Sequence, residues 1–430
     1  MLEKFFNLKE NKTTVRTEII AGITTFMTMA YILAVNPSIL SATGMDANAV
    51  FTATALSAVV ATLVMALWAK LPFALAPGMG LNAFFAFTVV ITMGHSWQFA
   101  LTAVFLEGII FLLLTAFNVR EVIVNAIPMN LKNAISAGIG LFIAFIGMQN
   151  AGLIVKNDAT MISLGSMAEH TVWIALFGLV VSGVLLALKV RGALLIGIFA
   201  SAIVGIPLGV THLPEGNWVS MPPSLEPIFF KFSLSEIFTT DMLVVLITFL
   251  FVDLFDTVGT LIGVASKANM IDKNGKLPRV KQALFADAVG TTVGAILGTS
   301  TVTTYVESAS GVAEGGRTGL TSLSVAGMFA LALFFAPVFL MVPGAATAPA
   351  LILVGSFMLS PILKINFDDY TESIPVFLTV IMMPLAYSIA EGIVFGMLSY
   401  VVLKLLTGRH KEVSVVMYAL AILFIAKFFF

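Results

Sequence analysis

Six carboxylates interrupt segments of the sequence that are otherwise apolar: Glu107, Asp253, Asp256, Asp287, Glu307 and Glu391. An ionisable side chain at the centre of a bilayer costs about 2.5–3.5 kcal/mol, so such residues mark a cavity, a partner or a functional site. Asp253 and Asp256 are three residues apart, which places both on one face of a helix. Because like charges this close favour protonation of one carboxyl, the pair suits a carrier coupled to protons. Asp253 could instead only support a neighbouring helix.

A second group of polar residues lies in two short segments that are rich in Gly or Thr. Glu307 lies in TTYVESASG and Asn82 in APGMGLNAFF. An interrupted helix leaves backbone N–H and C=O groups free for a small polar ligand. A carboxylate and an amide together carry donors and acceptors that can match the edge of a planar heterocycle. Phe84 or Phe85 could stack on its face, although an aromatic side chain at either position more commonly faces lipid or the core.

The remaining acidic residues are less informative. Asp287, in FADAVGTTVG, could relay protons or could orient the following segment by hydrogen bonding. Glu107 and Glu391 stand alone on apolar faces, and we expect each to form a structural hydrogen bond between helices. Glu314 lies close to Arg317 near the end of a segment, and we expect a solvated ion pair there.

The composition indicates which kind of structural element must position these side chains. The chain has 430 residues, of which 59% are hydrophobic and 10% charged, against about 25% charged residues in an average soluble protein. A soluble chain of this length would need far more polar surface, so we expect an all-α polytopic membrane protein. The net charge of −1 gives no indication of nucleic-acid binding, and the absence of Cys excludes disulfides. No phosphate-binding loop, metal-ligand spacing or catalytic triad stands out, so we expect neither a cofactor nor an enzyme.

Fourteen apolar segments can be drawn, most of them close to the roughly 20 residues that span a bilayer. They cover residues 18–38, 48–69, 72–91, 97–117, 125–150, 170–189, 192–210, 241–264, 281–298, 300–314, 319–341, 345–363, 372–388 and 389–407. A last apolar stretch from 413 to 430 is either a fifteenth span or a helix lying on the membrane. With a cytoplasmic N-terminus, only Lys156 and Lys231 fall in outer loops and Lys427 in this tail. The other 19 of the 22 basic residues then face the cytoplasm, as basic loop residues usually do.

The two halves of the chain resemble each other weakly. Each has an interrupted third segment, LPFALAPGMGLNAFFAF and TSTVTTYVESASGVAEGG, and a fifth segment that follows a Pro. Seven spans per half is an odd number, so the second half must be inverted. Inverted repeats with broken helices are typical of secondary transporters, and the breaks indicate the binding site. Gly and Pro are, however, also simply common in membrane helices.

Four motifs, EIIAGITTFMTMAYILAVNP, APGMGLNAFFAF, DLFDTVGTLIGVA and TYVESASGVAEGGRTGLT, resemble the azaguanine-type purine permeases of the nucleobase–ascorbate transporter group. The resemblance extends from about residue 3 to 425. It implies 14 spans in two inverted repeats of seven, with short strands in spans 3 and 10 that cross near the substrate. It also implies a core domain (1–117 and 241–341), a gate domain with an external linker (118–240, continued at 342–410) and a hydrophobic tail (411–430).

The same resemblance implies particular site residues. DTVGTL matches EHVGHL of the uracil-transporter branch, which implies that Asp256 binds the substrate, with Thr260 one turn further on. Tyr305 and Glu307 match YAENxG of that branch, but Ser308 replaces its Asn, so that contact differs here. Family members import purine bases by proton symport through a bacterial cell membrane. The implied proton carrier is Asp253, Asp287 or Glu307, and the fold's relatives suggest a homodimer through the gate domains.

The chemistry of purines agrees with this expectation. Guanine and hypoxanthine present an N1–H donor beside an O6 acceptor, and an ionised Asp256 or Glu307 can accept from it, with Asn82 nearby. Adenine presents a bare N1 acceptor, which would repel an ionised carboxylate. We therefore expect a guanine/hypoxanthine permease working by alternating access. An adenine permease is the alternative, and an anion carrier of the sulfate-permease fold is disfavoured by the buried acidic residues.

Overall fold

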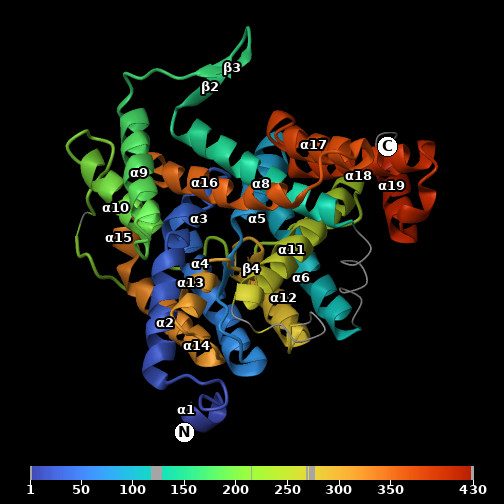
Figure 1. Cartoon of the computed structure of the whole chain (residues 1–430). Helices are drawn as coiled ribbons and strands as arrows, with labels where there is room; N and C mark the ends of the chain where they lie inside the picture. The colour runs from blue at the N-terminus through green and yellow to red at the C-terminus, as the bar shows by residue number, and fades with distance from the viewer. Residues whose placement is uncertain (1, 118–127, 215, 268–269, 271–276, 428–430) are drawn as a thin grey trace.

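The computed structural model describes residues 2–117, 128–214, 216–267, 270 and 277–427 (Figure 1). The first half contains α1 (Leu2–Phe5), α2 (Val15–Met29), α3 (Ile32–Ser41), α4 (Ala47–Val64), η1 (Met65–Ala69), β1 (Leu75–Pro77), α5 (Met79–Ala83), η2 (Phe84–Thr92), α6 (Trp97–Ala116), α8 (Met129–Asn150), β2 (Ile154–Asn157), β3 (Met161–Leu164), α9 (His170–Ala187) and α10 (Ala193–Gly205). The second half contains α11 (Thr240–Lys267), α12 (Val280–Leu297), β4 (Val302–Thr304), α13 (Ser308–Ala313), α14 (Gly319–Ala332), η3 (Leu333–Phe335), α15 (Ala336–Leu340), α16 (Gly344–Met358), η4 (Ser360–Lys364), α17 (Tyr370–Leu385), α18 (Ile389–Leu406), η5 (His410–Glu412) and α19 (Val415–Lys427).

The expected apolar segments all coincide with a helix or with a strand followed by a helix, and the chain is a mostly helical membrane protein. Within the described part of the chain, nine helical segments are long and apolar enough to cross a membrane. Met79–Thr92, Ala193–Gly205 and Tyr370–Leu385 are shorter apolar helices. The number of crossings therefore stays a prediction. The start of the segment expected at 125–150, and the expected domain boundary after residue 117, fall in residues 118–127, outside the described residues.

Local sequence explains where several of these helices begin. Ser, Thr and Asp side chains accept a hydrogen bond from the backbone N–H three residues later, which satisfies one of the N–H groups left free in the first turn. Thr14, Asp46, Ser96 and Ser388 do this for α2, α4, α6 and α18, at distances of 2.8–3.3 Å. Polar residues at the edges of the apolar segments thus begin these helices.

The short strands β1 and β4 pair in antiparallel fashion, and this pair is called the strand crossing below. Figure 1 shows β4 near the middle of the molecule. Leu75 of β1 pairs with Thr304 of β4, and Pro77 pairs with Val302. Each strand is followed at once by a short helix, α5 or α13. Gly78 follows β1, and a Cβ there would lie 2.5 Å from Cγ2 of Thr303, so only Gly allows this close approach. The strands expected in spans 3 and 10 are confirmed.

Helices from the two halves interleave in two packed groups. In one group, α2 and α4 pack against α14, and α4 and α6 pack against α12. In the other, α8 packs against α16 and α17, α9 against α10 and α16, and α17 against α18. Figure 1 shows α2 and α14 side by side although they come from opposite halves of the chain. The interrupted segments belong to the first group and meet the second through α5 and α8.

The C-terminal tail forms α19, which packs against α18. Met417, Ala421 and Phe424 are buried on one side, whereas Val415 and Ile422 are largely exposed on the other. The helix has 13 residues, which corresponds to about 20 Å at 1.5 Å per residue, against roughly 30 Å for the bilayer core. The described part of the tail is therefore shorter than a straight membrane crossing requires.

Candidate functional site

The strand crossing presents Glu307 to a buried tyrosine from the other half of the chain. Glu307 lies between β4 and α13 and is half-buried. Tyr31, at the junction of α2 and α3, is 1% exposed, and its hydroxyl donates to Oε1 of Glu307 at 2.6 Å. Among the described residues, no second side chain donates to Glu307. The sequence motif contained Tyr31, but its spacing gave no signal that these two residues meet.

Asp256 on α11 faces the same place and is also partly exposed. The charges of Asp287 and Glu307 act on it, and Tyr31 and Tyr305 both interact electrostatically with Asp256 and Glu307. Two carboxyl groups and two phenols from three separate segments thus gather at the strand crossing. Such a group offers acceptors and donors to a small polar ligand.

Tyr305 and Ser308, two expected site residues, hold the crossing together. The Tyr305 hydroxyl donates to the carbonyl of Pro77 at 2.5 Å, and the Ser308 hydroxyl accepts from the N–H of Ala74 at 3.0 Å. Both side chains are buried. Thr260 lies one turn beyond Asp256 on α11 and is partly exposed.

Asp253 and Asp287 are joined through one threonine. The Thr257 hydroxyl oxygen lies 3.0 Å from Oδ1 of Asp253, 2.8 Å from Oδ1 of Asp287 and 2.7 Å from Oγ1 of Thr303. These four residues are at most 1% exposed. A hydroxyl has a single proton to donate, so it can donate to only one of the two carboxylates. The second oxygen–oxygen contact is a hydrogen bond only when that carboxyl itself carries a proton.

Asn82 and Phe84 follow β1 in the chain, in α5 and at the start of η2. The amide oxygen of Asn82 accepts from the hydroxyl of Ser300, and its amide nitrogen has no protein partner within the described ranges. No hydrogen bond joins Asn82 to Asp256 or Glu307 in that part of the chain. Phe84 is fully buried and packs edge-on against Phe249 of α11, with ring centroids 4.8 Å apart.

Glu107 and Glu314 were each expected to have a particular kind of partner, and the structure shows the partners that they have. Glu107 accepts from the Thr301 hydroxyl at 2.5 Å, a structural hydrogen bond to the segment between α12 and β4. The expected bond from Glu107 to another helix stays a prediction. Glu314 does not pair with Arg317 as expected but forms an ion pair with Arg191, from the segment between α9 and α10. Arg317 instead donates to backbone carbonyls at the end of α13. The spacing of three had suggested a local pair, but packing of the α9–α10 connection beside α13 supplies a different partner.

Sequence reasoning also missed the role of Glu18. This carboxylate is fully buried on α2 and accepts from the N–H groups of Arg317, Thr318 and Thr321 at 2.9–3.2 Å, and from the hydroxyls of both threonines. It therefore caps the N-terminus of α14 from another helix, where a negative charge is favourable. Glu18 begins an apolar segment in the sequence, and nothing in its spacing indicates this partner.

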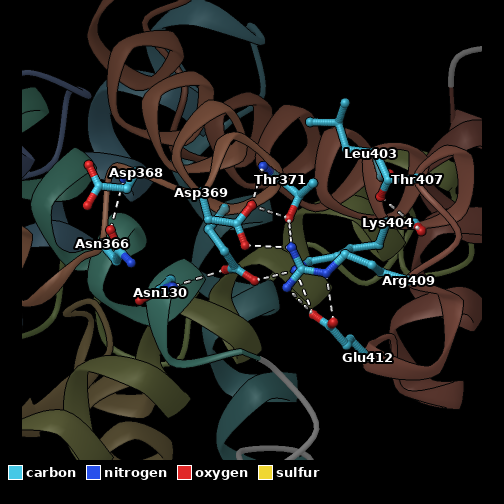
Figure 2. Close-up of polar contacts among 11 residues, drawn as sticks. Asn130, Asn366, Asp368, Asp369, Thr371, Leu403, Lys404, Thr407, Arg409 and Glu412 are labelled. Carbon is cyan, nitrogen blue, oxygen red and sulfur yellow. Dashed lines mark hydrogen bonds and ion pairs between the residues drawn. The ribbon is translucent and has the colours of Figure 1, made fainter.

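A separate charged network lies at the ends of α17 and α18, away from the strand crossing (Figure 2). Lys404 is fully buried and lies 2.7 Å from carboxylate oxygens of both Glu372 and Glu412. Arg409 donates to Glu412 at 2.7 Å and to Asp369 at 2.5 Å. The Arg409 guanidinium lowers the pKa of Glu412 to about 2, and holds the pKa of Asp369 well below its usual range. The network fixes η5, and with it the start of α19, on the ends of these two helices.

Apolar helices surrounding two interrupted segments, with carboxylates at the break, define a polytopic membrane permease. A family model described as the permease family matches residues 16–395. The chain belongs to this permease family, whose members are transport proteins rather than enzymes.

Individual relatives cover essentially the whole chain. The adenine permease AdeP of Escherichia coli (strain K12) is 46% identical over 430 residues, which are 100% of this chain and 96% of that protein. The guanine/hypoxanthine permease PbuG of Bacillus subtilis (strain 168) is 46% identical over 440 residues, which are 100% of both chains. The transmembrane domain of the cyanobacterial bicarbonate transporter BicA has the same fold, with a TM-score of 0.66 and 14% identity over 87% of this chain and 97% of that domain.

Proposed function

We propose that this permease imports purine nucleobases together with protons, and that guanine and hypoxanthine are its preferred substrates. The observation that carries the proposal is the pair of half-buried carboxyl groups, Asp256 and Glu307, at the crossing of β1 and β4. The names of relatives that match the whole chain, adenine permease and guanine/hypoxanthine permease, support purine bases as the substrate class.

The two carboxylates favour bases that carry a lactam edge. Guanine and hypoxanthine offer an N1–H donor to an ionised carboxylate, and guanine adds an N2 amine for a bidentate contact. Glu307 receives one hydrogen bond from Tyr31, which orients its carboxyl group. Adenine, the alternative substrate, would need a protonated carboxyl to donate to its N1. Overall identity does not choose between them, because the adenine and guanine/hypoxanthine relatives are each 46% identical.

The other candidate residues take supporting roles in this proposal. Tyr305 and Ser308 position the crossing through their bonds to β1 and to the residue before it. Thr260 lies one turn beyond Asp256 and would offer a hydroxyl to the base. Asn82 and Phe84 lie beside the crossing, where the free amide N–H of Asn82 would donate to the base and the Phe84 ring would close the pocket.

The coupled proton would reside in the buried group formed by Asp253, Thr257 and Asp287. Its geometry is fully hydrogen-bonded when one of the two carboxyls is protonated. Thr303 of β4 contacts the same hydroxyl. A change in protonation of this group would therefore change the hydrogen bond to the strand that precedes Glu307.

Transport would proceed by alternating access, with the core (1–117 and 241–341) moving against the gate (118–240 and 342–410). The packing of the helices into two groups supports this proposed division. The Arg191–Glu314 ion pair joins the two groups and would help to close the cytoplasmic side. The basic loops favour a cytoplasmic N-terminus in a bacterial inner membrane, and a homodimer through the gate is part of the proposal. An anion carrier is disfavoured because the site is acidic, although BicA shares the fold.

A thermal-unfolding screen of the purified chain tests this proposal. A ligand present at 100 times its Kd stabilises the folded state by about 2.7 kcal/mol, so hypoxanthine and guanine should raise the midpoint and bicarbonate should not. Asp256→Asn and Glu307→Gln should abolish the shift, whereas Glu391→Gln, another carboxylate in an apolar helix, should retain it. Stabilisation by adenine alone would select the alternative substrate. Stabilisation by bicarbonate or sulfate but by no base would overturn the assignment to nucleobases.

A further inference from the structure

A concave site lies at the end of the molecule that holds α1, and the described residues of its wall include none from β1 or β4. This cavity has a volume of about 840 Å³, within the roughly 300–1,000 Å³ of small-molecule sites. Its wall carries four cationic side chains, Lys12, Lys70, Arg279 and Arg317, and one carboxylate, Glu10. None of the four cations forms an ion pair with another residue in the described part of the chain. The described residues of the wall therefore carry a net positive charge of three.

Three of these cations are held in place by backbone carbonyls, which orient them without neutralising their charge. Lys70 Nζ donates to the backbone carbonyl of Phe5 at 3.0 Å and lies 4.4 Å from the centre of the Phe5 ring. Arg317 donates through Nη1 to two carbonyls near the end of α13, at 2.6 and 2.7 Å. Arg279 Nη1 lies 3.4 Å from the carbonyl of Ala69. A guanidinium has five N–H donors and an ammonium three, so each keeps donors for a ligand.

The start of α12 lies at the rim of the same cavity. Arg279 is the residue before the 18-residue helix, and no side chain caps its first turn. Uncapped N–H groups and the helix dipole both favour a bound anion. Phe6, Leu71 and Met270 add an apolar wall beside the cations.

We propose that this cavity binds a phosphate-bearing anion, either the headgroup of an acidic phospholipid or a soluble phosphate compound. Phosphate is the anion that several guanidinium and ammonium donors around one space match in charge and geometry. The site is distinct from the acidic strand crossing and does not depend on which base is transported. It is linked to that crossing through Arg317, which holds the end of the helix that follows Glu307.

A binding experiment with two probes tests the proposal and separates the sources of phosphate. The full chain is placed in nanodiscs of neutral phosphatidylcholine, and the midpoint of thermal unfolding is measured. One arm adds inorganic pyrophosphate, which has no base and so cannot occupy a nucleobase site. The other arm replaces one third of the lipid by phosphatidylglycerol. A saturable rise with pyrophosphate identifies a soluble ligand, and a rise with phosphatidylglycerol alone identifies a lipid headgroup.

The site variant and its control remove the same number of positive charges. Lys12 and Arg279 both have positive φ, which Asn tolerates better than other non-Gly residues, so the site variant is Lys12→Asn with Arg279→Asn. The control is Lys189→Asn with Lys364→Asn, which removes two exposed positive charges outside the cavity. Each lost charge-assisted hydrogen bond should weaken binding about tenfold, while the control should respond like the natural chain.

Two results would overturn the proposal. One is that neither probe stabilises the natural chain more than sodium chloride of the same ionic strength. The other is that the site variant responds as strongly as the control. Hypoxanthine stabilisation, measured on the same samples, should be unchanged in the site variant and so shows that the variant is folded.

Discussion

Replacing Thr257 by Val removes the hydroxyl that joins Asp253, Asp287 and Thr303 but keeps nearly the same shape in the helix. The hydroxyl makes three oxygen contacts of 2.7–3.0 Å in a region that is at most 1% exposed. A hydrogen bond to a charged group contributes about 1.5–3 kcal/mol and a neutral one about 1 kcal/mol. Thr257→Val should therefore lower the free energy of unfolding by about 3 kcal/mol. Thr257→Ser, which keeps the hydroxyl, should cost about 1 kcal/mol for the lost methyl group.

The functional consequence separates a proton-carrying role from a structural one. In proteoliposomes, exchange of labelled for unlabelled hypoxanthine needs no net proton movement, whereas accumulation driven by an inward pH gradient does. We expect Thr257→Val to retain exchange and to lose accumulation that depends on the gradient, and Thr257→Ser to retain both. The serine variant is the matched control, because the two substitutions differ mainly in the hydroxyl.

Two results would refute this reasoning. If Thr257→Val accumulates hypoxanthine as well as the natural chain, the shared hydroxyl plays no part in coupling. If exchange and accumulation fall together in both variants, the network only supports the fold.

Three further predictions concern the frame around the site. Glu18→Ala leaves three backbone N–H groups at the start of α14 without their acceptor, and should lower stability by about 3 kcal/mol in denaturant unfolding; an unchanged midpoint would contradict the capping role. Arg191→Gln breaks a partly exposed ion pair with Glu314 that contributes about 0.2–1 kcal/mol. A cysteine introduced at Val306, in a chain that has no other Cys, should then be labelled faster by a thiol reagent added on the cytoplasmic side. An unchanged labelling rate would argue against a role of this ion pair in closing that side. Arg409 lowers the pKa of Glu412 to about 2, below its unfolded value near 4.3. The stability that ionised Glu412 contributes to the fold is therefore present above about pH 4.5 and is lost as the pH falls towards 2. The midpoint of unfolding should fall as the pH is lowered from about 4.5 towards 2, and in Glu412→Gln it should depend less on pH over this range.

The sequence by itself determined which segments are apolar and where they are interrupted. Hydropathy is a property of neighbouring residues, so the apolar segments and the two breaks around APGMG and YVESASG could be read directly. Carboxylates are costly in such segments, which singled out Asp256 and Glu307 before any fold was known. The pairing of β1 with β4 followed from a family resemblance and not from spacing.

Only the tertiary structure decided which polar groups meet. Tyr31 and Glu307 are 276 residues apart in the chain yet share a hydrogen bond of 2.6 Å. Thr257 joins Asp253 on its own helix to Asp287 on the next, and Glu314 pairs with Arg191 rather than with its neighbour. A hydrogen bond requires two atoms to lie within about 3 Å, and the packing and rotation of helices set that distance. Sequence spacing fixes the face of one helix, but the partner on another helix depends on how the two halves of the chain pack together.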